Sequence, residues 1–289
     1  MSRILVTGGL GFIGSHLVDS LADKGHRVVV MDNLCSESSS RDYMRSDTEY
    51  WIDDIRNINH NKYRGRSFDV VYHLAALARI QPSFIDPLSH ISTNIMGTTH
   101  VLEFVRNNGA KLIYAGSSSA YADTMLNPYS FAKYTGEQTC MMYHRVYGMS
   151  IAIARFFNVY GDRQPIIGPY ATVVGVFEQQ MLQKKPLTVT GTGNQRRDFT
   201  HISDTVSGFE LLGRQSCSAE VFQLGVGENY SINELAALFG GDIARIPARP
   251  GEAWETRADY SDMQNVTGWS PRVNLKDYIN SWKRNNLSN

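Results

Sequence analysis

The sequence Ile4-Leu-Val-Thr-Gly-Gly-Leu-Gly-Phe-Ile-Gly14 runs from a short apolar strand through three glycines into an amphipathic helix, which the pattern predicts over His16–Lys24. Gly8 can take the tight turn that leaves the strand, Gly11 lets the backbone approach phosphate oxygens, and Gly14 lets the helix pack closely on the sheet. The free N–H groups at the start of the helix attract the negative charge of a pyrophosphate. The stretch therefore predicts a dinucleotide site, and the alternative is a glycine-rich turn in an ordinary βαβ unit.

Asp32 directly follows a second predicted strand, Arg27–Met31. A carboxylate at this position can accept both hydroxyl groups of an adenosine ribose. No arginine stands beside it to hold a 2′-phosphate, which the carboxylate would repel. The sequence therefore predicts NAD rather than NADP.

Composition excludes several kinds of partner. The 289 residues contain 28 Lys plus Arg against 28 Asp plus Glu and no long basic run, so we expect neither nucleic acid nor an anionic membrane as a partner. Cys35, Cys140 and Cys217 are odd in number and widely spaced, which favours free thiols over disulfides or a metal site. Met1 leads straight into the first strand, which leaves no room for a signal peptide, and no apolar run approaches a membrane span. We expect a cytoplasmic protein.

Strand-like and helix-like segments alternate along the first half of the chain, which predicts a doubly wound Rossmann α/β fold with a parallel sheet and helices on both faces. The expected strands are Ile4–Thr7, Val28–Met31, Val70–His73, Lys111–Ala115 and Ile151–Arg155. We expect residues 1–160 to form the NAD-binding domain and residues 161–289 a smaller C-terminal α/β lobe for the substrate. The segment from about 198 to 226 is expected to pack back on the first domain. In the second lobe, the pattern predicts a strand at Leu187–Thr190 and helices at Val174–Leu182 and Ile232–Phe239.

A second informative motif is Tyr129-Ser-Phe-Ala-Lys133, in which a phenol and an ammonium project from one helix face. A free tyrosine has a pKa near ~10, so it needs a nearby cation to act as a base at neutral pH. Lys133 and the positive ring of an oxidised nicotinamide would provide that field. Ser117, at the end of a predicted strand, could hold the same substrate oxygen. The alternative is a surface tyrosine and lysine at a spacing common in any helix.

With these motifs, nearly the whole chain resembles the extended short-chain dehydrogenase/reductase family and, within it, the nucleotide-sugar 4-epimerases. The resemblance rests on ten segments: Thr7–Gly14, Asp32–Leu34, Asp54–Arg56, His73–Ala76, Thr93–Thr98, Ser117–Ser119, Tyr129–Lys133, Arg155–Asn158, Gly191–Phe199 and Arg249–Glu252. It implies NAD-dependent 4-epimerisation of a UDP-hexose through transient oxidation at C4.

The resemblance also implies roles for individual residues, and it implies no metal. The implied catalytic residues are Ser117, Tyr129 and Lys133. The implied cofactor-binding residues are Gly8, Gly11, Phe12, Ile13, Asp32, Asn33, Asp54, Ile55, Leu74, Ala75, Ala76, Asn94, Tyr129, Lys133 and Phe156. The implied substrate-binding residues are Ser118, Ser119, Asn158, Val189, Arg197, Arg249 and Thr256. Arginines suit a buried diphosphate because the guanidinium binds phosphate oxygens in pairs.

Three departures from the family pattern bear on the substrate. Ser118 and Ser119 stand where relatives that decarboxylate or dehydrate nucleotide sugars have an acidic residue, which favours simple epimerisation. Thr256 replaces a large tyrosine, which leaves space for an N-acetyl group at C2, and Gly168–Ala171 resembles the subgroup that prefers N-acetylated sugars. Only eleven residues separate Ser117 from Tyr129, and Ala122 replaces a usual glycine, so we expect a more open rim.

We therefore expect UDP-GlcNAc and UDP-GalNAc as the favoured pair, with UDP-Glc and UDP-Gal as the second. The alternatives are a decarboxylase or dehydratase of the same fold, which would release carbon dioxide or water, and a non-catalytic NAD-binding sensor. The family's usual interface further implies a homodimer through two long helices, His90–Asn107 and Tyr129–Tyr147. The alternative for the apolar side chains of the second helix is that they pack in the core of one chain rather than in a dimer interface.

Overall fold

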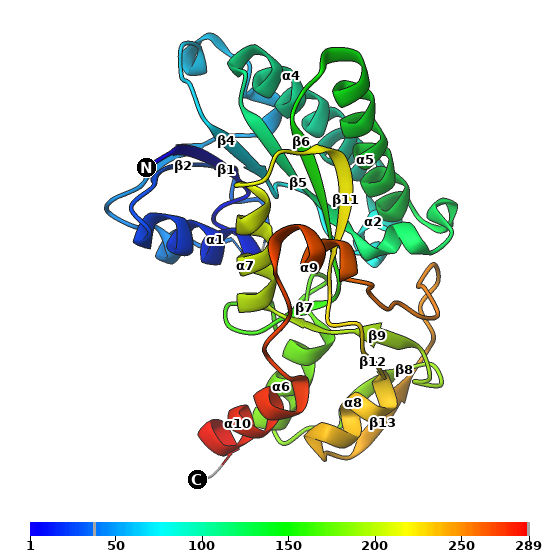
Figure 1. The fold of residues 1–289 in the computed structure, drawn as a ribbon. Coiled ribbons are helices and arrows are strands. Elements are labelled where there is room, and N and C mark those ends of the chain that lie inside the picture. The colour runs from blue at the N-terminus through cyan, green and yellow to red at the C-terminus, as the bar shows by residue number, and fades with distance from the viewer. Residues whose placement is uncertain (37–38, 288–289) are drawn as a thin grey trace.

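A seven-stranded parallel sheet forms the centre of the computed structural model, which describes residues 1–36 and 39–287 (Figure 1). Its strand order is β11-β6-β5-β4-β1-β2-β3, and every neighbouring pair is parallel. The strands are β1 (Arg3–Thr7), β2 (Arg27–Asp32), β3 (Glu49–Ile52), β4 (Val70–His73), β5 (Lys111–Ser117), β6 (Ile151–Phe156) and β11 (Ser218–Leu224). This confirms the predicted parallel sheet, to which β3 and β11 add a strand at each edge.

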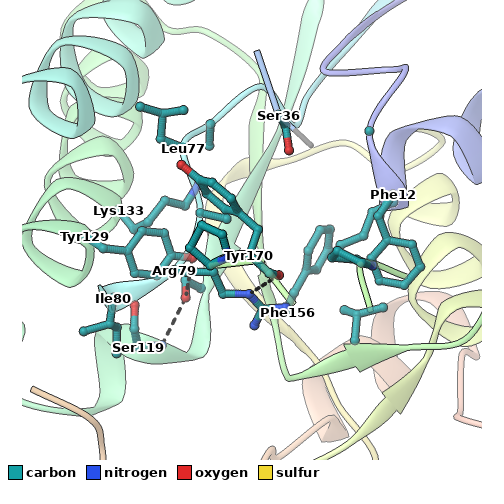
Figure 2. A pocket seen from close by; sticks show the side chains of 18 of the residues that line it. Phe12, Ser36, Leu77, Arg79, Ile80, Ser119, Tyr129, Lys133, Phe156 and Tyr170 are labelled. Atoms are coloured by element: carbon teal, nitrogen blue, oxygen red, sulfur yellow. Dashed lines mark hydrogen bonds between the residues drawn. The ribbon is translucent and has the colours of Figure 1, made fainter. Parts of the chain in front are cut away.

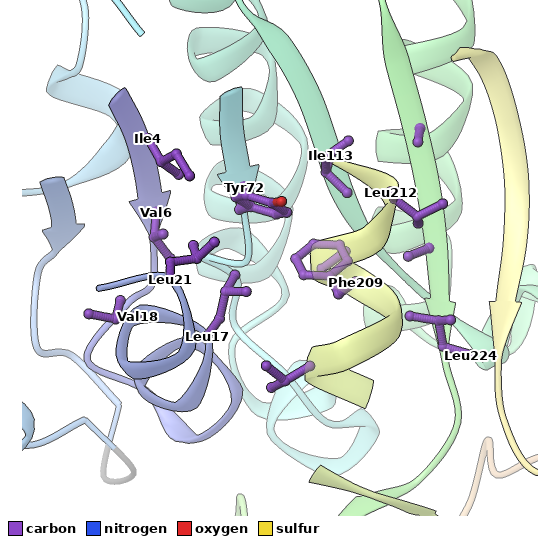
Figure 3. Close-up of a cluster of buried hydrophobic side chains, with 14 of the residues drawn as sticks. Ile4, Val6, Leu17, Val18, Leu21, Tyr72, Ile113, Phe209, Leu212 and Leu224 are labelled. Atoms are coloured by element: carbon purple, nitrogen blue, oxygen red, sulfur yellow. The ribbon is translucent and has the colours of Figure 1, made fainter. Parts of the chain in front are cut away.

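Both faces of the sheet are buried, because successive side chains of each strand point into different hydrophobic clusters. In β1, Ile4 and Val6 belong to one cluster and Leu5 to the other. Helices α1 (Phe12–Asp23) and α7 (Ile202–Leu212) cover the first face, and α4 (Thr98–Asn108) and α5 (Pro128–Tyr147) cover the second (Figure 1). Figure 3 shows the first cluster, where Phe209 of α7 lies against Tyr72 of the sheet at a ring distance of 5.3 Å.

The first helix begins one turn earlier than the sequence pattern predicts. It spans Phe12–Asp23 rather than His16–Lys24, with Gly11 as its N-cap residue. The glycines themselves complete the turn from β1, so the helix starts as soon as the chain has reversed. Its first turn therefore lies at the end of the sheet where the strands finish.

Two elements within the segment from 198 to 226 pack on the main sheet or extend it. Helix α7 packs on α1, and β11 pairs with β6 in the main sheet. A further segment near the C-terminus does the same, because Met263 of α9 (Ser261–Thr267) and Trp269 are buried in the same cluster as α7. The indole Nε1 of Trp269 donates to the backbone oxygen of Asp204, 3.1 Å away.

The second lobe is built from short elements around its own apolar cluster, below the main sheet in Figure 1. Its helices are α6 (Val173–Leu182), α8 (Ile232–Phe239) and α10 (Leu275–Leu287). Its paired strands are β8 (Leu187–Thr190) with β13 (Ile243–Ile246), and β9 (Arg196–Asp198) with β12 (Asn229–Ser231). Strand β7 (Val159–Tyr160) pairs with β10 (Thr200–His201) where the chain passes between the lobes.

The helix predicted at His90–Asn107 is interrupted by a wider turn. It starts as α3 (Pro87–Ile91), continues through a π-helical segment, η4 (Ser92–Gly97), and ends as α4. Such π turns insert extra backbone into a helix and are frequent at functional sites. Here the insertion places Asn94 beneath the loop that follows β4.

Short helices complete the structure. They are α2 (Ile80–Ile85) and the 3₁₀ turns η1 (Arg41–Tyr43), η2 (Ile55–Asn57), η3 (Asn61–Tyr63), η5 (Ser118–Tyr121) and η6 (Thr124–Leu126). Among the helices described, none combines the length and apolar character needed to cross a bilayer.

Candidate active site

A cleft of about 760 Å³ lies between the carboxyl ends of the main strands and the second lobe. Its walls include the turns after β1, β2, β4 and β5, together with residues from 165 to 197 and from 249 to 256. The carboxyl edge is where parallel α/β sheets bind ligands, because the loops there diverge on either side of a strand-order reversal.

Backbone contacts in the glycine turn leave no room for side chains. Gly8 has φ +72°, and a Cβ there would lie 2.7 Å from the backbone nitrogen of Ala75. A Cβ on Gly14 would lie 2.0 Å from the carbonyl oxygen of Gly8. At Gly11 the helix α1 receives no side-chain cap, so the amides of its first turn are open to the cleft. These residues fit the pyrophosphate of a dinucleotide, because free amides and the helix dipole both attract an anion.

Asp32 is buried at the rim of this cradle. Its carboxylate accepts hydrogen bonds from the backbone N–H of Leu10 at 3.0 Å and of Leu34 at 2.8 Å. Burial raises the pKa of Asp32, while these two backbone bonds act in the opposite direction. Each carboxylate oxygen keeps further acceptor capacity, which suits ribose hydroxyls. Nearby, the Asn33 amide donates to Asp54 at 3.0 Å, and both side chains line the cleft with Ile55.

Asn94 lies behind the wall of the cleft, so its contact with the cofactor stays a prediction. It is 1% exposed, and its amide accepts from the N–H of Leu77 at 2.8 Å and donates to the carbonyl of Leu77 at 2.9 Å. Leu74, Ala75 and Ala76 line the cleft and directly precede Leu77, whose backbone is bonded to Asn94. Asn94 therefore acts through the backbone, by holding the loop on which they lie.

Tyr129 and Ser117 meet on the floor of the cleft. The Tyr129 hydroxyl donates to Oγ of Ser117 at 3.4 Å, and Oγ also accepts from the N–H of Ser119 at 3.2 Å. Helix α5 brings Tyr129 there because Asn127 caps the helix and Pro128 occupies its first turn. Burial raises the pKa of Tyr129, whereas the Ser117 bond and the charge of Arg79 lower it.

Lys133 lies one turn further along α5 and is 5% exposed. Its ammonium donates to the carbonyl of Ala115 at 2.6 Å and lies 4.5 Å from the centre of the Tyr114 ring. Burial lowers the pKa of Lys133 to about 8. In this arrangement the ammonium points to the strand end beside Tyr129, within the cleft wall (Figure 2).

A buried ion pair supports the turn at Ser117. Glu137, on the same face of α5 as Lys133, is fully buried and binds Arg155 of β6 at 2.7 Å. The same carboxylate accepts from the N–H of Ser117 at 3.4 Å. The guanidinium of Arg155 lies 4.6 Å from the ring centre of Tyr121, which stacks on Phe157. Sequence analysis missed Glu137, although its spacing of four residues from Lys133 was a signal.

Substrate-side residues come from both lobes. Ser118, Ser119, Asn158, Arg197, Arg249 and Thr256 all line the cleft. Two of them hold buried oxygens, Oγ of Ser119 and Oγ1 of Thr256, for which the described part of the chain offers no hydrogen-bond partner. Such orphaned groups cost free energy unless a ligand or water satisfies them. Arg197 binds Glu252 at 3.5 Å and burial lowers its pKa, whereas Arg249 is exposed at the mouth.

The Val189 side chain does not line the cleft, so the contact of this residue with the substrate stays a prediction. It is fully buried in the apolar cluster of the second lobe. Side chains alternate along β8, so the neighbours Thr188 and Thr190 face the cleft instead.

Sequence analysis also missed Arg79, which enters the cleft beside Tyr129 (Figure 2). Its Nε donates to the carbonyl of Tyr170 at 3.1 Å. The available signal was an arginine six residues after His73, directly behind the apolar run Leu74–Ala78.

Comparison with known proteins agrees with this arrangement. A model of the NAD dependent epimerase/dehydratase family matches residues 4–225. A Methanocaldococcus jannaschii protein with the provisional name UDP-glucose 4-epimerase is 32% identical over 98% of this chain and 99% of its own length. UDP-glucuronic acid decarboxylase 1 of Xenopus tropicalis is 31% identical over 96% of this chain and 70% of its own length.

Solved structures share the whole fold. Thermotoga maritima UDP-glucose 4-epimerase with UDP-glucose has a TM-score of 0.91 and 30% identity over 99% of both chains. Bacillus cereus UDP-glucuronic acid 4-epimerase with UDP-glucuronic acid and NAD has a TM-score of 0.88 and 30% identity over 99% of both chains. Methanobrevibacter ruminantium UDP-N-acetylglucosamine 4-epimerase in complex with UDP-N-acetylmuramic acid has a TM-score of 0.87 and 27% identity, over 99% of this chain and 97% of that one. With the family model over most of the chain and relatives matched over nearly its whole length, the chain belongs to the NAD-dependent epimerase/dehydratase family.

Proposed function

We propose that this enzyme interconverts a UDP-hexose and its C4 epimer. The observation that carries the proposal is the pairing of Tyr129 with Ser117 on the floor of a cleft whose other end is the glycine cradle. A base, a hydroxyl-holding serine and a dinucleotide site in one cleft provide what oxidation and reduction of a sugar carbon require. We assign cofactor binding to residues 1–160 together with the segment from about 198 to 226, and substrate binding mainly to residues 161–289.

The enzyme uses NAD, as its family does. Its pyrophosphate would lie on the open amides of α1 between Gly11 and Ile13, and its adenosine ribose on Asp32. Phe12 and Phe156 line the cleft around that path, and Lys133 lies at the nicotinamide end. When bound, NAD supplies an acceptor for the C4 hydride and later returns it.

Tyr129 takes the proton of the C4 hydroxyl while the C4–H bond is broken, which leaves a 4-keto sugar. Ser117 holds the same oxygen during both half-reactions, because its Oγ lies within reach of the phenol. When the hydride returns to the opposite face of C4, Tyr129 gives the proton back. No group is consumed, so the reaction needs no external reductant.

Inversion requires the keto sugar to turn over while the nucleotide stays bound. Arg197 and Arg249 approach the cleft from the second lobe, where two guanidinium groups can hold a diphosphate. Strong contacts to the diphosphate and few to the sugar would allow this rotation without release of the intermediate.

Elimination chemistry is the second candidate, and the chain around Ser117 argues against it. Ser118 and Ser119 follow the catalytic serine, so no carboxylate stands next to it in the sequence. Glu252 lines the cleft but is paired with Arg197. A non-catalytic NAD sensor is disfavoured because cofactor binding alone does not require the Tyr129–Ser117 pair.

We propose an N-acetylated hexose as the favoured substrate. Thr256 is a 5% exposed residue of the cleft wall, and its buried Oγ1 has no hydrogen-bond partner in the described part of the chain. A small side chain there leaves space beside the sugar, and its hydroxyl can bind an acetamido group. Incubation with UDP-GlcNAc, UDP-Glc and their C4 epimers, followed by NMR of the products, tests both the reaction and the preference.

The Asp32→Ala variant should bind NAD at least about tenfold more weakly, because it removes the acceptor for two ribose hydroxyls. An added Asn33→Arg change should relax discrimination against NADP by supplying a cation for the 2′-phosphate. Titration calorimetry with both dinucleotides measures these effects. Asp32→Asn keeps the size of the side chain and serves as control for the backbone bonds to Leu10 and Leu34. Equal NAD affinity in wild type and Asp32→Ala would reject the assignment.

Tyr129→Phe should lower the turnover number by roughly 10² to 10⁴ while fold and bound NAD remain, because it removes only the proton-transferring oxygen. The NMR assay gives the rate, and circular dichroism with NAD titration checks the fold. Turnover within a factor of a few of wild type would contradict the role of Tyr129.

Thr256→Tyr should reduce kcat/KM for UDP-GlcNAc far more than for UDP-Glc, since the added ring would occupy the acetamido space. Loss of one well-filled contact changes specificity by about 1 to 3 kcal/mol, and a clash costs more. Thr256→Val, which keeps the shape, is the matched control and should lose only the hydroxyl contact. If the ratio of the two kcat/KM values stays at its wild-type level in Thr256→Tyr, the argument for an N-acetyl sugar fails.

We also propose a homodimer through the helices on the second face of the sheet. Leu88 of α3, Met96 of η4 and Val146 of α5 are 80%, 52% and 62% exposed. On α5, Phe131 and Met142 are also exposed, whereas Met141 packs against the core and Tyr143 is buried in it. The helices touch one another and form a continuous outer layer (Figure 1). Exposed apolar side chains gathered on one layer favour association.

Light scattering at micromolar concentration should therefore return about twice the chain mass of 32.4 kDa. The double variant Leu88→Glu with Val146→Glu should shift the particle to the mass of one chain, because it places charges in the interface. Ile243→Glu, on the exposed edge of the second lobe, is the control and should leave the mass unchanged. A wild-type particle of one chain mass would exclude the dimer.

A further inference from the structure

Arg79 is held in a backbone conformation that side-chain-bearing residues rarely adopt. Its φ is +81° and its ψ is 142°, directly after the loop that follows β4. Non-glycine residues in this region are strained and are concentrated at functional sites. A glycine at this position would relieve the strain. The presence of an arginine instead indicates that its side chain has a function.

The strained backbone directs a cation to the reacting end of the cleft. In Figure 2 the Arg79 side chain extends between Tyr129 and Phe156. Its Nε donates to the carbonyl of Tyr170 at 3.1 Å, which orients the guanidinium plane. Among the described residues, its terminal nitrogens have no hydrogen bond and no carboxylate within ion-pair distance. Glu252, a nearby acid of the cleft wall, forms an ion pair with Arg197 at 3.5 Å, and its charge acts on Arg79 only from a greater distance.

A partly buried guanidinium with free terminal nitrogens is the chemistry that recognises a carboxylate in two parallel hydrogen bonds. The diphosphate already has Arg197 and Arg249 on the second lobe. Arg79 comes from the first lobe and is close enough to Tyr129 to influence its pKa. Tyr129 is assigned to C4 of the sugar, whose neighbours are C3, which carries a hydroxyl, and C5, which carries C6. Of these two groups only C6 can be a carboxylate, so the free guanidinium of Arg79 matches the C5 side.

We propose that Arg79 binds the C6 carboxylate of a hexuronic acid, so that the enzyme epimerises a UDP-hexuronate in preference to the corresponding neutral sugar. The proposal rests on the 4-epimerase function above and concerns C6 alone, so it is independent of the substituent at C2. The orphaned Oγ of Ser119, on the other side of Tyr129 in Figure 2, offers a further hydrogen bond to the sugar.

This contact also accounts for retention of the carboxylate. Oxidation of a uronate at C4 produces a β-keto acid, which loses carbon dioxide when the C5–C6 bond breaks and its electron pair moves into the C4 carbonyl as an enolate. A guanidinium bound to the C6 carboxylate stabilises the negative charge of the keto acid before decarboxylation. It stabilises this charge less in the transition state, where the charge moves to the C4 oxygen. Arg79 would thus oppose decarboxylation while the keto sugar turns over.

The experiment compares UDP-glucuronate with UDP-glucose, which differ only at C6. For the wild-type enzyme with NAD, kcat/KM should be at least about tenfold higher for UDP-glucuronate, a factor within the range of a charged hydrogen-bonded pair. Arg79→Gln should remove this preference by lowering the UDP-glucuronate value by at least the same factor, with UDP-glucose changed less than about threefold. Arg79→Gly should give the same result. Because glycine adopts the backbone conformation of residue 79 without strain, a loss in this variant cannot be attributed to misfolding. Arg249→Gln is the matched control and should weaken both substrates to the same extent.

A second measurement counts UDP-pentose among the products of UDP-glucuronate. Its share should rise in Arg79→Gln and Arg79→Gly relative to wild type. An equal loss for both substrates in these variants would overturn the proposal, because Arg79 would then serve the diphosphate or the field at Tyr129.

Failure of the proposed function gives a different pattern. If UDP-glucose or UDP-GlcNAc is epimerised without a preference for UDP-glucuronate, the epimerase function holds and the carboxylate site is rejected. If no UDP-sugar is turned over, the epimerase function is rejected and calorimetry decides on Arg79. Tighter binding of UDP-glucuronate than of UDP-glucose, lost in Arg79→Gln, would sustain the site, and equal affinities would reject it.

Discussion

The close backbone contact between Gly14 and Gly8 determines where the rest of the cleft can form. With a Cβ on Gly14 only 2.0 Å from the Gly8 carbonyl, any other residue would push α1 away from the end of β1. The contact keeps the first-turn amides at the carboxyl edge of the sheet, next to Asp32 and the loop at Leu74–Ala76. The proposed position of the cofactor therefore depends on the contact between Gly14 and Gly8. The proposed position of the reacting carbon depends on it as well.

At the other end of the cleft, the positions of Tyr129 and Ser117 depend on buried side chains of helix α5. Tyr129, Lys133 and Glu137 succeed one another at intervals of four on α5, and all three turn towards the ends of β5 and β6. Glu137 and Arg155 form an ion pair in which the acid is fully buried, and removal of one partner from such a pair costs about 3–5 kcal/mol. The Glu137 carboxylate also accepts a hydrogen bond from the N–H of Ser117, so the ion pair holds the turn on which Ser117 meets Tyr129.

The two lobes meet across the cleft through few hydrogen bonds near its rim. The rim segment at 250–251 is held to the first lobe by two bonds, from Gln81 to the carbonyl of Pro250 and from Asn127 to the carbonyl of Gly251, each 3.0 Å long. Because Asn127 lies in the short connection between Ser117 and Tyr129, its bond to Gly251 joins this connection to the rim segment. These bonds close the rim over the end of the cleft at Tyr129, whose wall also includes Arg79, Thr256 and Ser119.

Local sequence patterns were sufficient to predict the fold class and the cofactor. Glycine spacing, apolar strands and the acid after β2 are readable in short windows, and the helix Ile232–Phe239 has the predicted bounds. Strand β3 escaped prediction because it is short and half of its residues are exposed. Which side chains reach the cleft depends instead on contacts between segments that are far apart in the sequence. Val189 and Asn94 turn into the interior, while Arg79 enters the site through a strained backbone that no sequence period encodes. Local periodicity determines where a strand or helix runs, but packing between distant segments determines which way a loop side chain points.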